Sequence, residues 1–364
     1  MVLLLFTLLF RERGNFDITK YLIDNGANIN ARDNSFSTPL HVSIENSCDC
    51  KHYIDDDKNE NLVFPNVKYL IDSGAQINAL NENNEQPIHF AVKNGYRNIV
   101  QYLIEKGAQM ECTNHNNQTP LIVATSEGHV NVVEYLIGKG ANIECRNKEN
   151  QTPLIVAASK EHSYEYIEIV KYLVGNGAQI NAKDEFGSGP LHEAAKNMQK
   201  WHDNPTKIRH LIKSGAKIDA KDKDGETPLH LAAENLDQVI LTHNGIRERL
   251  SPLSVVKLLI ENGAKINIKN NKGKTTLDVA NQEDVKEYLT EKQTETTSEE
   301  TVSNQDPCVI CHGPRNGFFV LLPCGHASLC EDCCKKITKD KFGKCPSCRR
   351  PTKSYTKIFF QVPE

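Results

Sequence analysis

A Gly-Ala pair recurs seven times along the chain, and a second marker follows each pair at one fixed distance. The glycines of the pairs are Gly26, Gly74, Gly107, Gly140, Gly177, Gly215 and Gly263, and the second markers are Pro39, Pro87, Pro120, Pro153, Pro190, Pro228 and Thr276. Each glycine and its marker are 13 residues apart, whereas successive glycines are 33 to 48 residues apart. All variation in length therefore falls between a marker and the next glycine. Such a constant interval predicts a stack of like units rather than a single globular core.

Each unit is predicted to hold two helices and to be joined to the next unit by a hairpin-like finger. The marker proline suits the first turn of one helix, where its missing N–H is not needed, and the glycine suits the left-handed residue that ends the other. Three residues before the marker stand Asn84, Asn117, Asn150, Gly187, Gly225 and Gly273, which tolerate positive φ, with Phe36 as the exception. The extra segments, at 46–63, 161–164, 199–204 and 236–252, are predicted to lengthen the turn between the helices.

The markers read TPLH at 38–41 and 227–230 and TPLI at 119–122 and 152–155, and this pattern resembles the ankyrin-repeat family. The resemblance implies a mainly α fold, with an ankyrin-repeat solenoid of about seven to eight repeats over residues 1–290, the first of them truncated. It also implies that the repeats bind a protein substrate, whose identity the sequence does not reveal. In the family the histidines of the marker motif are structural, and here they are His41, His89, His192 and His230.

The N-terminal run MVLLLFTLLF is apolar but is predicted to belong to the first repeat. It is shorter than the roughly 20 residues that span a bilayer. It also has no basic segment before it and no small-residue cleavage site after it. The repeat register aligns Gly14 with Gly95 and places the run over the first helix of a repeat. No membrane contact is expected, and both a native start at Met1 and a truncated reading frame stay open.

Residues 291–306, EKQTETTSEETVSNQD, lack helical periodicity and aromatic side chains, so they predict a flexible polar linker. Upstream of this linker the cysteines are too sparse for a disulfide framework, which favours a reducing compartment. The chain is therefore expected in the cytoplasm, with the nucleus as the alternative.

The four upstream cysteines give no indication of catalytic chemistry in the repeats. Cys112 and Cys145 hold the same place in successive repeats and are expected to act as small packing residues. Cys48 and Cys50 lie in the first insertion and could bind a metal with His41 and His52. Because Cys-x-Cys alone is a poor ligand signature, loop thiols are the favoured interpretation.

Eight further cysteines lie in the last 57 residues, and seven of them form a metal-binding order with one histidine. The order is Cys308-x2-Cys311-x12-Cys324-x-His326-x3-Cys330-x2-Cys333-x11-Cys345-x2-Cys348. Zinc prefers four tetrahedral Cys and His ligands, so eight ligands predict two closed, structural Zn2+ sites with no open position for substrate. A domain of ~45 residues buries too little apolar surface to fold unaided, so zinc is expected to supply much of its stability.

This order resembles the RING-finger family, which implies a small two-zinc cross-brace domain over residues 307–353. By that resemblance Cys308, Cys311, Cys330 and Cys333 bind one zinc ion, and Cys324, His326, Cys345 and Cys348 bind the other. Cys334 is an alternative to Cys333 that would break the CxxC spacing. Another zinc fold, used to contact DNA or protein, is the alternative to a RING.

Charge gives little support to nucleic-acid binding. The net charge of the chain is −4, although residues 308–364 carry ten Lys and Arg against four Asp and Glu. Seven thiolates and two Zn2+ ions would lower the local charge to about +3, and no RNA-binding aromatic pattern accompanies it. No nucleic-acid partner is therefore expected.

Four residues match the positions with which RING ligases bind a ubiquitin-conjugating enzyme. The family has a large aliphatic residue before the second ligand, here Ile310, and a bulky apolar residue four after the sixth, here Ile337. A proline follows the seventh ligand, here Pro346. A cation follows the last, here Arg349, and in the family it bridges the conjugating enzyme and ubiquitin. Each residue alone has solvated or packing roles as its alternative.

The closest subgroup is the RING of inhibitor-of-apoptosis proteins, because PCGH at 323–326 and CPSCR at 345–349 match it. In that subgroup the C-terminal strand drives dimerisation, and an aromatic eleven residues after the last cysteine helps to hold the partner's ubiquitin. Here the tail is 354–364, Phe359 holds that position, and Phe360 follows. The stretch SYTKIFFQV is rich in strand-forming residues. The alternative is a short strand that closes a monomeric RING.

Together these motifs predict a RING-type ubiquitin ligase (E3), which is an enzyme without a covalent intermediate of its own. The RING would bind ubiquitin and its conjugating enzyme, and the ankyrin repeats would recruit the substrate. Catalysis would then consist of orienting the thioester toward a substrate lysine. The alternative is a non-catalytic ankyrin adaptor in which zinc only stabilises the fold. The sequence does not identify the conjugating enzyme or the chain linkage.

Overall fold

A computed structural model describes residues 16–45, 56–160, 163–197, 205–234, 238–241, 247–250, 252–300, 318–322 and 354–358 of the chain. In residues 56–59 and 295–300 and in the strands, only the backbone is described. The chain divides into two compact units, Met1–Leu289 and Thr290–Glu364.

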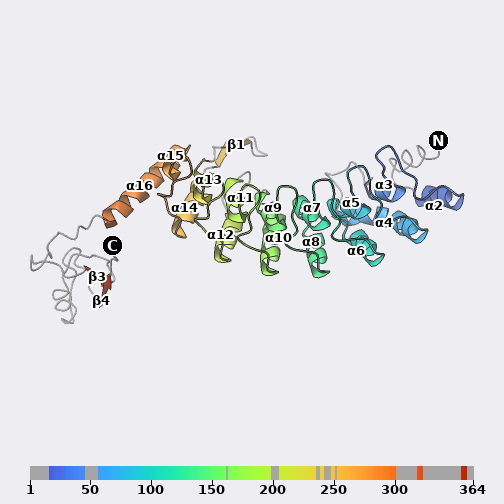
Figure 1. Cartoon of the computed structure of the whole chain (residues 1–364), viewed down its shortest axis with the longest axis horizontal. Helices are drawn as coiled ribbons and strands as arrows, with labels where there is room; N and C mark the ends of the chain where they lie inside the picture. Colours follow the sequence, from blue (N-terminus) through green and yellow to red (C-terminus); the bar gives the residue numbers. More distant parts are fainter. Residues whose placement is uncertain are drawn as a thin grey trace, which may run out of the picture. The chain divides into compact units, whose positions relative to one another are not determined.

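The first unit is a stack of helix pairs, as predicted. The inner helices begin at the markers and are α3 (Pro39–Glu45), α5 (Pro87–Lys93), α7 (Pro120–Glu127), α9 (Pro153–Ser159), α11 (Pro190–Lys196), α13 (Pro228–Glu234) and α15 (Thr276–Val279). The outer helices are α2 (Phe16–Asp24), α4 (Asp56–Asp72), α6 (Arg97–Glu105), α8 (Val130–Gly138), α10 (Tyr164–Gly175), α12 (Thr206–Lys213), α14 (Leu253–Glu261) and α16 (Glu283–Glu300). Figure 1 shows the two rows of helices side by side. The predicted first helix of the first repeat lies outside the described residues.

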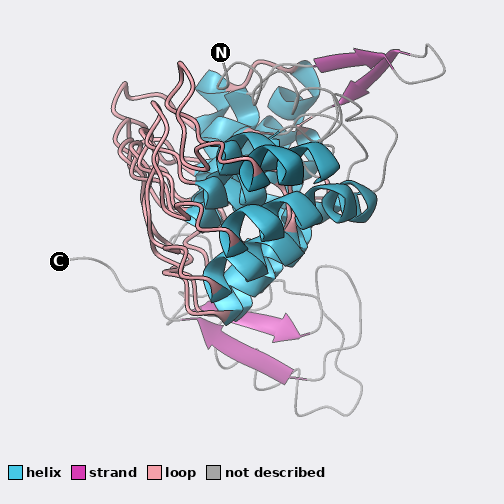
Figure 2. Ribbon diagram, turned by 90° about the vertical axis from the view of Figure 1, so that its right-hand side faces the viewer, coloured by secondary structure: helices cyan, strands magenta, loops and turns pink. Residues whose placement is uncertain are grey.

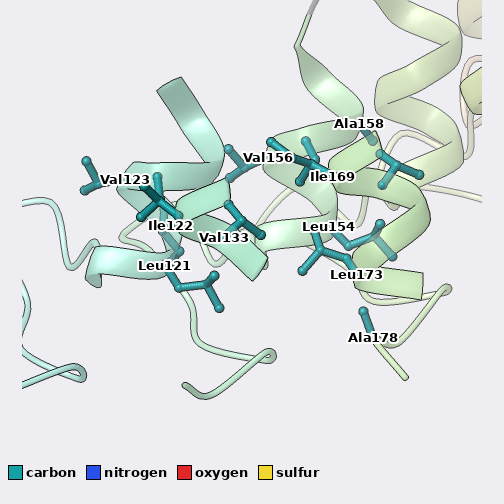
Figure 3. Packing of buried hydrophobic residues seen from close by; sticks show 14 of the residues in the cluster. Leu121, Ile122, Val123, Val133, Leu154, Val156, Ala158, Ile169, Leu173 and Ala178 are labelled. Carbon is teal, nitrogen blue, oxygen red and sulfur yellow. The ribbon is translucent and has the colours of Figure 1, made fainter. Parts of the chain in front are cut away.

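The core runs between the two rows of helices. It is formed by buried aliphatic residues from Leu40 to Leu289 in one continuous cluster. Figure 3 shows its centre, where the side chains of α7 and α9 lie among those of α8 and α10. Fully burying a Leu or Ile side chain contributes about 1.5–3 kcal/mol. Each repeat within the stack is therefore stabilised by packing against the repeats on either side of it.

The fingers have the predicted left-handed residue at the third position before the marker. Backbone φ there is 57° to 59° in Asn84, Asn117 and Asn150, and 59° in Phe36. Phe36 thus adopts the same turn as Asn and Gly, although a bulky side chain disfavours it. The turn is held by a further residue that the sequence interpretation missed, an Asp or Asn six positions before the marker. For example, Asp184 Oδ1 accepts hydrogen bonds from Phe186 N at 2.9 Å and Ser188 N at 2.8 Å.

Neighbouring repeats are tied together at their finger end. At each of the six junctions one finger donates a backbone hydrogen bond to the preceding finger, as from Glu82 N to Ser35 O at 2.9 Å. The marker histidines add a second set of hydrogen bonds between neighbouring repeats. His41 Nδ1 accepts from Thr38 N at 3.1 Å, and Nε2 lies 3.1 Å from Glu85 O of the next finger. Figure 2 shows the fingers, drawn as pink loops, gathered on one side of the helices.

The opposite end of the inner helices is capped by side chains of the following repeat. Asn94 Nδ2 donates to Ile44 O at 3.0 Å, and His129 Nε2 to Lys93 O at 2.9 Å. Tyr166 hydroxyl donates to Ser126 O at 2.8 Å. The side chain of Lys207 is fully buried and donates to Ala158 O at 3.3 Å, Ala157 O at 3.5 Å and Lys160 O. These bonds satisfy last-turn carbonyls that have no partner within their own helix.

Two insertions form regular structure instead of only lengthening a turn. Residues from Asp56 onward extend the outer helix α4, where Glu60 is buried and accepts from Ile99 N at 2.7 Å, so it caps α6. In the last insertion β1 (Gln238–Leu241) pairs antiparallel with β2 (Arg247–Leu250), with Gln238 opposite Leu250. Both insertions lie between an inner and an outer helix, away from the fingers.

The predicted linker 291–306 is wrong in its first part, because α16 continues to Glu300. Val285 and Leu289 are fully buried at the start of this helix and anchor it to the last repeat. The Glu, Lys and Gln residues that follow are good helix formers, so the helix continues beyond its packed turns. Residues 301–306 lie outside the described residues. Of the helices that the structure describes, none is long and apolar enough to cross a membrane.

Candidate functional site

The predicted zinc ligands and RING contact residues all lie outside the described part of the chain. The ligands are Cys308, Cys311, Cys324, His326, Cys330, Cys333, Cys345 and Cys348, and the contact residues are Ile310, Ile337, Pro346, Arg349, Phe359 and Phe360. Their donor set, seven thiolates and one imidazole, suits Zn2+ rather than a hard cation such as Mg2+. The assignment of these residues therefore stays a prediction.

Two strands are described within this C-terminal segment. β3 (Phe318–Leu322) pairs antiparallel with β4 (Ser354–Ile358), with Phe318 opposite Ile358 and Leu322 opposite Ser354. The predicted strand of the tail is thus confirmed over Ser354–Ile358. In the sequence β3 lies between the second and third predicted ligands, whereas β4 follows the last one. The sequence interpretation missed β3, although its run of apolar strand formers, FFVLL, signals it.

The marker histidines are occupied by structural hydrogen bonds. Nδ1 of His192 accepts from Gly189 N at 3.2 Å, so Nε2 carries the proton and donates to Ala220 O at 3.0 Å. Both ring nitrogens of His41 make hydrogen bonds in the same way, so neither is free to bind a metal. The other residues of that alternative metal site, Cys48, Cys50 and His52, lie outside the described residues. Within the described ranges, no three His, Cys, Asp or Glu side chains are arranged to hold a metal.

Acid is expected to destabilise the repeats through these histidines. Burial is the main cause that lowers the pKa of His41, His89 and His192 below the usual value near 6.5. Because the unfolded chain binds more protons on these imidazoles than the folded chain does, the free energy of unfolding should decrease as the pH falls through about 6.5 and below. Urea unfolding followed by circular dichroism between pH 7.5 and 5 measures this slope.

The chain offers its own control for this effect, because α7 and α9 carry Ile122 and Ile155 at the histidine position. A His192→Ile variant should be less stable at pH 7.5, since it loses two hydrogen bonds, but it should lose less stability on acidification. A variant with an unchanged acid slope would contradict the assigned role of His192.

The repeats contain no activated thiol among their described cysteines. Burial raises the pKa of Cys112 to about 12 and that of Cys145 to about 11. Cys145 is buried beside Thr119, with Sγ and Oγ1 3.1 Å apart, and it belongs to the core cluster. Both thiols are therefore protonated at neutral pH, and their predicted role as packing residues is confirmed.

The finger surface exposes both apolar and basic side chains. Exposed apolar side chains occur there at Phe36, Leu80 and Phe186. Basic side chains at equivalent positions donate hydrogen bonds to the backbone of the next finger. Arg146 donates to Lys183 O at 2.9 Å, and Lys183 Nζ donates to Lys221 O at 2.7 Å. The resulting surface combines fixed backbone turns with varied side chains, which suits recognition of a polypeptide.

The comparisons with known proteins agree with this architecture. Residues 107–184, 163–243 and 191–300 match the family described as ankyrin repeats (3 copies), and residues 8–50 and 63–104 match ankyrin repeats (many copies). Residues 304–355 match the zinc finger of C3HC4 type, the RING finger. The chain therefore belongs to the ankyrin-repeat family and carries a C3HC4 RING finger after the repeats. The resemblance to the inhibitor-of-apoptosis subgroup stays a prediction.

Two known proteins are similar to this chain. A segment of 50 residues is 46% identical to the Mitochondrial E3 ubiquitin protein ligase 1 of Drosophila melanogaster. That match covers 14% of this chain and 13% of the relative. The crystal structure of the ankyrin repeat domain of Bcl-3, a member of the IkappaB family, aligns with a TM-score of 0.51 and 25% identity, covering 70% of this chain and 98% of that chain.

Proposed function

We propose that the chain is a RING-type ubiquitin ligase that recruits a protein substrate through its ankyrin repeats. The observation that carries this proposal is the C3HC4 RING finger at residues 304–355. The 46% identity over 50 residues to a protein named as an E3 ubiquitin ligase supports it. The fold of the repeats, with its exposed finger residues, supplies a surface for a protein partner.

In the proposed mechanism the chain acts by orientation and forms no bond to ubiquitin. Two zinc ions, held by the eight predicted ligands, stabilise the RING. Ile310, Ile337 and Pro346 bind the conjugating enzyme, and Arg349 contacts both this enzyme and its ubiquitin. The amine of a substrate lysine attacks the thioester carbonyl, and the thiolate of the conjugating enzyme leaves. Holding the reactants in this geometry lowers the entropic part of the barrier.

The proposal is tested by autoubiquitination with a panel of conjugating enzymes. The wild-type chain should form ubiquitin conjugates with at least one of them. Ile310→Ala and Arg349→Ala should each lower the rate at least about tenfold, because each removes a central contact of a small interface. Arg350→Ala, which changes the neighbouring cation, should stay close to the wild-type rate.

Absence of conjugates with every conjugating enzyme would favour the second candidate, a non-catalytic ankyrin adaptor with a structural zinc domain. An equal loss of conjugation rate in Arg349→Ala and Arg350→Ala would contradict the specific role of Arg349. Dimerisation through Phe359 and Phe360, and residence in the cytoplasm or the nucleus, are further parts of the proposal. Sedimentation of the wild type and a Phe359→Ala variant tests the first, and imaging of the tagged chain tests the second.

A further inference from the structure

The third residue after the marker keeps a small exposure in the inner helices α3, α5, α7, α9 and α11. In α3, α5, α7 and α9 this residue is apolar, and it is 5% to 8% exposed in Val42, Phe90, Val123 and Val156. In α11 the same position is Glu193, which is 9% exposed. The flanking repeats place Val156 and Leu231 at this position. A single carboxylate therefore interrupts an apolar row that crosses adjacent inner helices.

The carboxylate of Glu193 is poorly satisfied within the chain. Its Oε2 accepts one long hydrogen bond, from Asn197 Nδ2 at 3.3 Å. Within the described part of the chain Oε1 accepts no hydrogen bond, yet it is not among the fully buried atoms without a partner, so it reaches solvent. Burial raises the pKa of this carboxyl above its usual value, and Asp184 and Glu149 add to the rise while Lys196 opposes it.

The nearby finger surface adds negative charge and an aromatic ring. Glu185 N donates to Glu149 O at 3.0 Å, which places these two residues on adjacent fingers side by side. The next residue, Phe186, is 62% exposed. Basic residues are also present on these fingers, but Lys183 is engaged, because its Nζ donates to Lys221 O at 2.7 Å. A partly desolvated carboxylate attracts a cation more strongly than an exposed one does.

We propose that the repeats bind an extended segment of the partner protein through a lysine or arginine of that segment, which pairs with Glu193. Apolar side chains on either side of this cation pack against Val156 and Leu231. The cation supplies the hydrogen bond that Oε1 lacks and adds to the partial compensation that Lys196 gives this carboxylate. This inference rests on the proposed function, because it takes the repeats to bind the substrate and names the chemistry of the bound segment.

The test is selection of randomised 12-residue peptides displayed on phage, with the full-length chain as the bait. Selected peptides should contain a lysine or arginine flanked by apolar residues. Glu193→Gln should raise their Kd by about tenfold or more, the loss expected for a charged hydrogen bond. Glu127→Gln, which changes an exposed carboxylate on the inner helix α7, is the matched control and should leave Kd within about twofold.

A second arm excludes a purely structural role for Glu193. Replacing the cation of a selected peptide by glutamine should weaken binding to the wild type but have little further effect on Glu193→Gln, since both changes remove the same pair. The melting temperature of Glu193→Gln should not fall, because the variant replaces a desolvated charge by a neutral group of the same shape.

Three results would overturn the inference: selected peptides without a cation, equal affinity for Glu193→Gln, or no selected peptide at all. The binding assay contains no ubiquitin, and the autoubiquitination assay contains no peptide. Failure of one assay therefore leaves the other proposal standing.

Discussion

Removal of zinc is expected to unfold the C-terminal domain and to leave the repeats intact. Residues 304–355 match a RING finger, and a domain of this size depends on its metal for most of its folding free energy. The first unit instead has a continuous apolar core. A zinc chelator should therefore make the C-terminal domain sensitive to protease, and it should abolish any ubiquitin conjugation. The thermal transition of the helices, followed by circular dichroism, should stay where it was.

The amount of metal tests the predicted ligand set. Elemental analysis should find two zinc ions per chain, and Cys308→Ser should reduce this number. Cys112→Ser should bind as much zinc as the wild type, since Cys112 belongs to a repeat finger. A zinc content of one, or a loss of repeat structure on chelation, would contradict the assignment.

Lys207→Met is expected to be among the most destabilising single changes in the repeats. The ammonium of Lys207 is fully buried and donates to three carbonyls at the end of α9. Methionine fills a similar volume but has no donor, so these carbonyls lose a charged partner. The expected loss is about 2–3 kcal/mol in the free energy of unfolding, measured by urea denaturation.

The control for this variant lies on the same helix. Lys213 is exposed in the last turn of α12, so Lys213→Met should change the free energy of unfolding by less than about 0.5 kcal/mol. Hydrogen exchange should show faster opening of α9 in Lys207→Met and unchanged opening of α5. Similar losses in the two variants would show that the buried ammonium has no special role.

The fold could be predicted where one residue type decides a backbone conformation. Asn84 and its equivalents identified the finger turn because Asn and Gly tolerate positive φ. Phe36 has the same φ because the finger is held by other bonds, including Phe36 N to Asp33 O at 3.0 Å. The zinc ligands are proposed from residue type and spacing, since the metal dictates both the kind and the number of its ligands, and this assignment stays a prediction.

Other features could not be predicted, because they depend on which residues meet across a junction. The last carbonyls of the inner helices are capped by unrelated side chains, namely Asn94, His129, Tyr166 and Lys207. Because the residue type differs at each junction, these caps form no pattern in one sequence. Glu193 stands in a row that becomes apparent only when the inner helices are aligned side by side. The continuation of α16 to Glu300 was missed because composition was given more weight than the helix propensity of Glu, Lys and Gln.

The finger-to-finger bonds have a consequence for how this chain can change in evolution. They join backbone atoms, so the identity of the side chains does not matter to them. Loss of residues 107–139, one whole unit, would bring the carbonyl of Asn83 to the amide of Lys148 in place of that of His115. Gene duplication or deletion can therefore add or remove whole units without altering how the units are joined, while it changes the set of side chains that a partner meets.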